Sequence, residues 1–227
     1  MSASGLAAAV ARIGQLQSHL PTAVSLLLAL VAAAAVSPGA WLLTRHITVM
    51  AHEGAHATVG SALGHKINGI EFALNADGAT HTTGPGGKMG AFTILFAGYL
   101  GPSAFGIGAA ELIKAGRIVA VLWAGLAALA AIMLVMRRSF GVITVILAIL
   151  TLFSIAGFAT VSVQVTTAYL IAWFLLVSSI RIITIRGKDA DDAGKLSGLT
   201  KIPAGFWSRV WLLGSIAALV FGATLLL

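Results

Sequence analysis

Long apolar runs constrain this chain more than any other feature of its sequence. Hydrophobic residues make up 59% of the chain and charged residues only 9%, a composition far from that of soluble domains. Runs of about 20 apolar residues are long enough to cross a bilayer as helices. They predict seven transmembrane helices, at residues 21–37, 39–64, 89–110, 116–136, 140–159, 164–185 and 206–226. We therefore expect an all-α polytopic membrane protein, a single membrane-embedded domain over residues 1–227 with a flexible tail at 1–19.

The segment between the second and third predicted helices has the pattern of β-strands. In residues 66–84, Ile70 and Phe72 alternate with polar or small residues, and Asp77-Gly78 follows. Asp-Gly between alternating stretches is the strongest short hairpin signal. The pattern predicts a β-hairpin with Asp77-Gly78 at its turn, beside helix 39–64 at the membrane surface. An irregular loop is the alternative.

Glycines in the second and third predicted helices indicate how these helices meet. Gly54 and Gly60 lie in the second helix, and Gly98 and Gly101 lie in the third. Small residues let helix backbones approach closely in lipid, where packing takes the place of the hydrophobic effect. We expect these two helices to pack together.

The basic residues predict an orientation in the membrane. A net charge of +7 would suggest a nucleic-acid partner in a soluble protein, but here the cations fall in short loops, which indicates topology and lipid contact. With the N-terminus inside, most cations are cytoplasmic: Arg12, Lys66, Lys88, Arg137, Arg138, Arg181, Arg186, Lys188, Lys195, Lys201 and Arg209. The outer loops hold Lys114 and Arg117. We expect a cell-membrane protein with a cytoplasmic N-terminus and no nucleic-acid partner, and helix 39–64 then has its inner half toward the cytoplasm.

Three ionisable residues lie close together in that inner half, in the string His52-Glu53-Gly54-Ala55-His56. Helical residues four apart share a face, so both imidazoles point to one side with Glu53 beside them. Two neutral imidazoles suit a tetrahedral zinc ion, which lowers the pKa of a bound water toward about 7, and Glu53 is placed to take its proton. Such a string can arise by chance. However, each ionisable group in a membrane helix costs about 2.5 kcal/mol or more, so the cluster indicates a functional site.

A catalytic zinc site takes a third protein ligand. Because the chain has no cysteine, zinc would be held here by His and carboxylate, and we expect a carboxylate to complete the site. Glu111 lies on the predicted outer side. The acids on the side of the histidines lie in two segments, the hairpin and the polar stretch 186–205: Glu71, Asp77, Asp189, Asp191 and Asp192. Topology leaves both segments open as the source of the ligand.

Three stretches of the sequence carry a resemblance to a known family. They are residues 52–56, the segment Gly98-Tyr99-Leu100-Gly101-Pro102, and Asp191-Asp192-Ala193 with Leu196, Leu199, Thr200 and Pro203. In these stretches the chain resembles the M50 metallopeptidases, the site-2 protease class of intramembrane zinc proteases, and in particular the M50B-like branch. The resemblance implies His52, His56 and Asp192 as zinc ligands and Glu53 as the base.

The chain departs from this family at the aspartate. The family at large carries a Leu-Asp-Gly or Asn-Pro-Asp-Gly motif at the start of a helix, and the nearest string here is Asn75-Ala76-Asp77-Gly78 in the predicted hairpin. Asp77 therefore remains the alternative third ligand.

The resemblance implies a zinc-dependent metalloendopeptidase that cuts a membrane-protein or peptide substrate in or near a transmembrane segment. Two other functions use the same histidines: a membrane metal-ion transporter or sensor, and a catalytically inactive, protease-like membrane scaffold. A transporter predicts further acids and histidines along adjacent helices. Glu53 argues against an inactive scaffold, since an inactive relative does not need the base.

Overall fold

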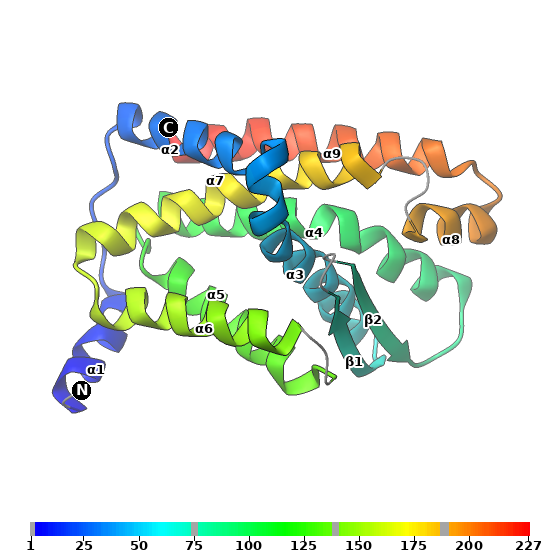
Figure 1. Ribbon diagram of the computed structural model, residues 1–227, viewed down its shortest axis with the longest axis horizontal. Helices are drawn as coiled ribbons and strands as arrows, with labels where there is room; N and C mark the ends of the chain where they lie inside the picture. The colour runs from blue at the N-terminus through cyan, green and yellow to red at the C-terminus, as the bar shows by residue number, and fades with distance from the viewer. Residues whose placement is uncertain (1–2, 74–76, 138–140, 187–190) are drawn as a thin grey trace.

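The computed structural model describes residues 3–73, 77–137, 141–186 and 191–227 (Figure 1). Its elements are α1 (Ala3–Ala11), η1 (Arg12–Gly14), α2 (Thr22–Ala35), α3 (Pro38–Ala62), β1 (Lys66–Phe72), β2 (Gly78–Thr83), α4 (Lys88–Lys114), α5 (Ala120–Val135), α6 (Gly141–Phe158), α7 (Val161–Arg186), α8 (Asp191–Thr200) and α9 (Ala204–Leu226). A helix lies at each of the seven predicted positions.

The described helices differ in their capacity to cross a membrane. Four of them, α4, α6, α7 and α9, are long and apolar enough to do so. The helices α2 and α3 pass the same test only as a pair, and α5 is shorter. The structure thus supports a polytopic helical membrane protein with four candidate spans, or five if the pair counts as one. It does not confirm the predicted count of seven.

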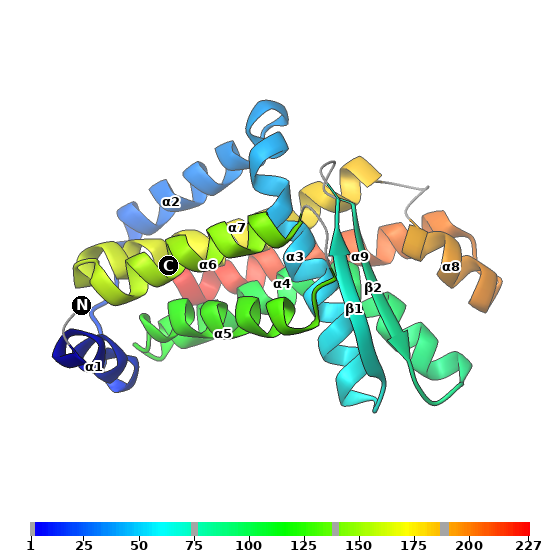
Figure 2. The same cartoon turned by 60° about the horizontal axis from the view of Figure 1, so that its bottom comes forward.

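The break between α2 and α3 bends the path of the chain by 99°. Pro38 has no backbone N–H and cannot continue α2, so it stands in the first turn of α3 after the extended Ser37. The chain does not reverse at this point, as two separate spans would require. Instead, α2 and α3 together run from one end of the molecule to the other (Figures 1 and 2).

Hydrogen bonds place the N-terminal segment at one end of the molecule. The Gln17 N–H donates to the carbonyl of Gly116 (2.8 Å), the Val119 N–H donates to Oε1 of Gln17 (3.0 Å), and Thr22 Oγ1 donates to the carbonyl of Leu227 (3.1 Å). The hairpin and α8 lie at the opposite end (Figure 1). The segment with Arg12 and the hairpin, both expected on the cytoplasmic side, therefore lie at opposite ends of the molecule, with the bent α2–α3 pair between them.

Residues 3–14 also differ from the flexible tail that we expected at 1–19. The segment is rich in alanine, the strongest helix former, and it forms α1 and η1. The α1 helix packs on α6, and Ala9 is only 1% exposed. This packing gives the short helix a stability that its own propensity would not supply.

The hairpin forms as predicted, but its turn is displaced. The strands β1 and β2 are antiparallel, with Phe72 opposite Gly78, and the Ala73 N–H donates to the carbonyl of Asp77 (2.8 Å). Gly78 is therefore the first residue of the second strand and Asp77 directly precedes it, so the prediction that Asp77-Gly78 forms the turn is wrong. Residues 74–76, which include part of the Asn75–Gly78 string, lie outside the described part of the chain.

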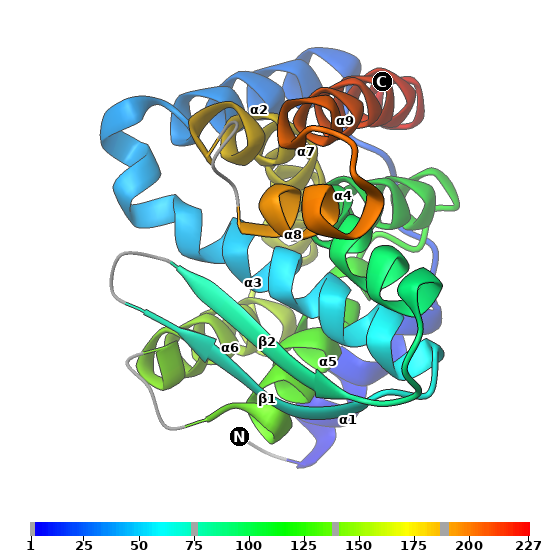
Figure 3. The same cartoon turned by 90° about the vertical axis from the view of Figure 1, so that its right-hand side faces the viewer.

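One edge of this hairpin is covered. The Arg137 N–H donates to the carbonyl of Ile70 (3.0 Å), and Met136 forms a parallel bridge with the same residue. Among the described residues, no strand pairs with the outer edge of β2. Figure 3 shows the two strands lying across α3 on one side and the α5–α6 pair on the other.

The helix α4 lies at the centre of the bundle, where it packs on α3, α7 and α9. An ideal Cβ at Gly101 would collide with the Cβ of Ala55 and lie 3.0 Å from the carbonyl oxygen of Ala51. The predicted close packing of helices 39–64 and 89–110 is confirmed. The tight contact brings the histidines of α3 directly against α4.

Candidate metal centre

The two histidines of α3 meet at a buried point between α3 and α4. His52 and His56 are each 7% exposed, and they lie one turn apart on the same face of the helix. Their Nε2 atoms are 3.1 Å apart, and their ring centroids are separated by 4.7 Å. The convergence that the spacing of the histidines predicted is present.

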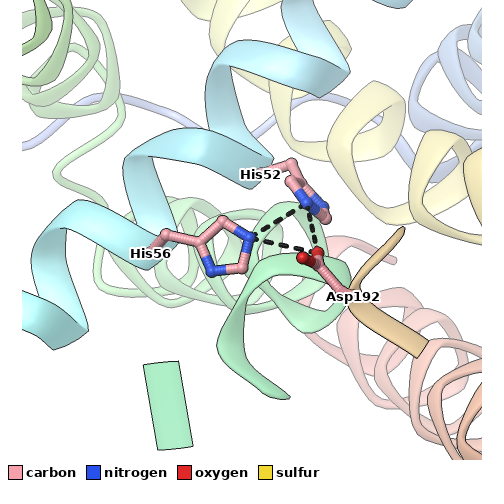
Figure 4. Close-up of side chains that lie close together, drawn as sticks. All are labelled: His52, His56 and Asp192. Carbon is pink, nitrogen blue, oxygen red and sulfur yellow. Dashed lines mark hydrogen bonds and ion pairs between the residues drawn. The ribbon is translucent and has the colours of Figure 1, made fainter. Parts of the chain in front are cut away.

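Asp192 reaches the same point from α8. Its Oδ2 lies 3.0 Å from Nε2 of His52 and 3.2 Å from Nε2 of His56 (Figure 4). The side chain is buried because Ala193 and Leu196, both 0% exposed, fix α8 in the core around the site. Within the described residues, these three side chains form the group whose atoms are close enough to hold a metal ion.

The other candidate ligands do not join this group. Asp77 is exposed directly before the second strand, and Glu71 pairs with Arg137 on the surface (3.2 Å). Glu111 lies near the end of α4 that is remote from the site. Asp189 and the side chain of Asp191 lie outside the described part of the chain.

Asp192 is ionised in this environment. Its burial acts to raise the pKa, but His52 and His56, which donate hydrogen bonds to it when their Nε2 atoms are protonated, act in the opposite direction and hold the pKa of this carboxyl well below its usual value. The site thus presents a carboxylate and two imidazoles on facing elements.

The arrangement of these three residues fits a small divalent cation. The Nδ1 of His56 donates to the carbonyl of Ile94 (2.7 Å), which leaves Nε2 of the neutral ring as an acceptor. That acceptor faces the carboxylate oxygen of Asp192. The three ligand atoms are 3.0–3.2 Å apart, and ligands about 2.0 Å from a tetrahedral zinc are separated by about 3.3 Å. A metal cation between these atoms would take the place of the protons that otherwise lie between the nitrogen and oxygen lone pairs.

An aromatic wall supports His52 from the side of α9. The ring of His52 lies edge-on to Tyr99, with centroids 4.6 Å apart, and Tyr99 lies against Trp211 at the same centroid distance. The indole Nε1 of Trp211 donates to the carbonyl of Phe96 (3.0 Å). This chain of contacts holds the imidazole by packing.

Glu53 lies beside the histidines but points toward the hairpin. It is 4% exposed, and its Oε2 accepts a hydrogen bond from Thr80 Oγ1 of β2 (2.6 Å). An ideal Cβ at Gly78 would lie 2.6 Å from Oε1 of Glu53. The carboxylate is therefore enclosed by β2 and is not part of the group that could bind a metal.

Gly98 of α4 leaves the space that the two histidines occupy. An ideal Cβ there would collide with Cε1 and Nε2 of His56 and lie 2.7 Å from Cε1 of His52. We expect Gly98→Ala to displace the imidazoles and to weaken zinc binding roughly tenfold or more, the size of effect that supporting residues have at metal sites. Zinc titration of the purified protein against a competing chelator measures this.

Gly108→Ala is the matched control for this substitution. It makes the same change in the same helix, and no atom lies within 4 Å of the added Cβ. Equal zinc affinity in the two variants would contradict a role for Gly98 in shaping the site.

Sequence reasoning did not foresee the roles of Thr80, Gly78 and Ile94. Ile94 acts through its backbone carbonyl, which no side-chain pattern reveals. For Thr80 and Gly78, the sequence could have indicated only that both lie on the same face of β2, because residues two apart on a strand share a face. Gly98 was noted for helix packing, and its place above the histidines emerged only from the structure.

Comparison with known proteins agrees with this geometry. The profile of the family described as Peptidase M50B-like matches residues 24–222. No curated protein and no solved structure matches the chain. The family match spans most of the sequence and includes α3, which carries both histidines, and α8, which carries Asp192. The chain belongs to the M50B-like peptidase family.

Proposed function

We propose that this protein is a zinc metallopeptidase that hydrolyses a peptide bond in or near a transmembrane segment of another membrane protein. The observation that carries the proposal is the buried meeting of His52, His56 and Asp192 with Glu53 beside them. Zinc held by these three residues would polarise the scissile carbonyl and lower the pKa of a bound water molecule.

Glu53 would supply the proton transfer. Its carboxylate takes the proton of the attacking water and then passes it to the nitrogen of the leaving amine. The protein would also exclude bulk water from these steps, since the four side chains are at most 8% exposed. Low exposure strengthens the interactions between the carboxylates and the groups that they act on.

The substrate would have to be extended at the cut. A helix in a membrane keeps all its backbone groups hydrogen-bonded, so the segment must unwind locally before its peptide bond becomes accessible. No strand in the described part of the chain pairs with the outer edge of β2, so this edge could pair with such a segment. Because Thr80 of this strand contacts Glu53, a peptide paired there would lie near the base.

A metal transporter is the weaker interpretation of the same residues. Transport across the bundle would need further ligating side chains along adjacent helices. In the part of the chain that the structure describes, one His and Asp group is close enough to bind a metal.

The proposal is tested by expression with a library of single-span membrane proteins. Substrates should be cleaved in cells that express the native protein. They should accumulate uncut in cells that express the Glu53→Gln variant instead. If no library member is cleaved differently in the two strains, and purified zinc-loaded protein cleaves none of them either, the peptidase function is wrong.

The cations support an orientation with the site toward the cytoplasm. Apart from Arg45 in the first half of α3, the described cations at the end with the hairpin and α8 outnumber those at the other end: Lys66, Lys88, Arg137, Arg181, Arg186, Lys195, Lys201 and Arg209 against Arg12, Lys114 and Arg117. Positive residues favour the cytoplasmic side. Together with the bent α2–α3 pair, this charge distribution favours an N-terminus on the outer side.

Reporter fusions check this orientation. Fusions after Arg138 and after Lys195 are expected to read as cytoplasmic, and fusions at the N-terminus and after Leu227 as external. An external reading after Lys195 would place the site on the outer side. A cytoplasmic N-terminus combined with an external C-terminus would mean that the chain crosses the membrane an odd number of times, as in the seven-helix prediction from the sequence.

A further inference from the structure

The side chain of Glu53 is held by a residue far away in the sequence. Thr80 Oγ1 lies 2.6 Å from Oε2 of Glu53 and 3.2 Å from its backbone oxygen, across 27 positions of the chain. Gly78, two residues earlier in β2, covers the other carboxylate oxygen. The strand thus sets the orientation of this carboxylate, although the helix α3 carries it.

The chemistry of the contact makes it stronger than a neutral hydrogen bond. A hydroxyl donating to a carboxylate forms a charge-assisted bond of about twice the usual strength. Glu53 is 4% exposed, so water contributes little to its solvation, and a buried carboxylate is costly without a donor. A free glutamate side chain would populate several rotamers, and the bond to Thr80 selects one of them.

The same strand is also the one with an open edge. Met136 and Arg137 cover β1, whereas no described strand pairs with the outer edge of β2. A peptide that paired there would stiffen the strand that carries Thr80. Binding of an extended segment and alignment of the carboxylate would then be connected through one side chain.

We propose that Thr80 is a positioning residue that holds Oε2 of Glu53 and keeps the carboxylate aligned for proton transfer. This inference rests on the proposed peptidase function. Thr80 acts through Glu53 and does not touch the reacting atoms itself. A carboxylate has about four lone-pair sites, and the hydroxyl of Thr80 uses one of them.

The test compares three variants at equal zinc content. Thr80→Val removes the hydroxyl at constant shape, and we expect kcat to fall between about tenfold and 100-fold, since misplacing a catalytic group by about 1 Å has effects of this size. KM should change by less than about threefold, because the backbone edge of β2 is intact. Thr80→Ser, which keeps the donor, should restore most of the lost kcat.

Thr82→Val is the matched control. Thr82 lies on the same face of β2, with its methyl group near Gly60, and its substitution should leave kcat close to the native value. If Thr80 only anchored the hairpin, Thr80→Val would instead raise KM or lower the melting temperature. A native kcat in Thr80→Val at full zinc content would overturn the inference.

A second readout does not depend on cleavage. The chain has three glutamates, Glu53, Glu71 and Glu111, so infrared spectra of protein labelled with ¹³C-glutamate contain few carboxyl bands. The band that disappears in Glu53→Gln belongs to Glu53. It should shift in Thr80→Val and return to its native position in Thr80→Ser and Thr82→Val.

The two readouts separate the possible failures. If the native protein cleaves no substrate but the band shifts as expected, the peptidase function is wrong while Thr80 still holds Glu53. If the native protein cleaves and the band does not shift in Thr80→Val, the positioning role of Thr80 is wrong.

Discussion

Glu53→Gln is expected to abolish peptide cleavage while zinc binding stays close to one ion per chain. Glutamine has the shape of glutamate, and its amide oxygen can still accept the hydrogen bond from Thr80. It cannot take a proton from water at neutral pH. Loss of a general base costs about 10² to 10⁴ in rate, which brings turnover near the detection limit of most membrane-protease assays.

Zinc content and cleavage rate must be measured on the same preparation. Glu53 lies outside the His52, His56 and Asp192 group, so its substitution should leave bound zinc unchanged. His52→Ala and His56→Ala should lose both zinc and activity, and they serve as the contrasting pair. Retained activity in Glu53→Gln would show that this carboxylate is not the base.

Asp192→Ala is expected to remove activity and to lower zinc affinity by more than about 100-fold, beyond the effect of losing a supporting residue. The carboxylate is one of three ligand atoms that lie 3.0–3.2 Å apart. Without it, two imidazoles would hold the ion with two open positions, which is too few protein ligands for a stable catalytic site. Zinc per chain and cleavage rate, measured together, test this.

Asp77→Ala is the control for this prediction, because Asp77 was the other candidate ligand and lies exposed just before β2. We expect near-native zinc binding in this variant, and mild effects in Asp189→Ala and Asp191→Ala. Zinc loss confined to Asp77→Ala would move the third ligand to the hairpin. Zinc loss in none of the four variants would mean that a group other than these acids completes the site.

Local patterns in the sequence determined the helices, the strands and two of the candidate ligands. Apolar runs are visible in the sequence because every backbone polar group inside a bilayer must be satisfied within its own helix. The pairing of His52 with His56 follows from the period of a helix, which is the same wherever the helix packs. Likewise, the alternation of apolar and polar residues around Ile70 and Phe72 predicted β1, because side chains alternate between the two faces of any strand.

Contacts between distant segments determined what local patterns could not. Topology alone left five acids as candidates, and Asp192 is distinguished from Asp77 only because α8 packs its Ala193 and Leu196 into the core beside α3. Likewise, Pro38 predicts a break, but whether the chain reverses there or bends by 99° depends on what α2 and the segment before it contact.

The sequence by itself determined that the chain is a helical membrane protein with a His and Glu cluster on one helix, because burial in lipid and helix periodicity act on neighbouring residues. Only the tertiary structure decided that Asp192 completes the group, that Thr80 holds Glu53, and that the N-terminus lies at the end opposite the site. Each of these depends on packing between residues far apart in the chain, and their sequence spacing carries no information about such packing.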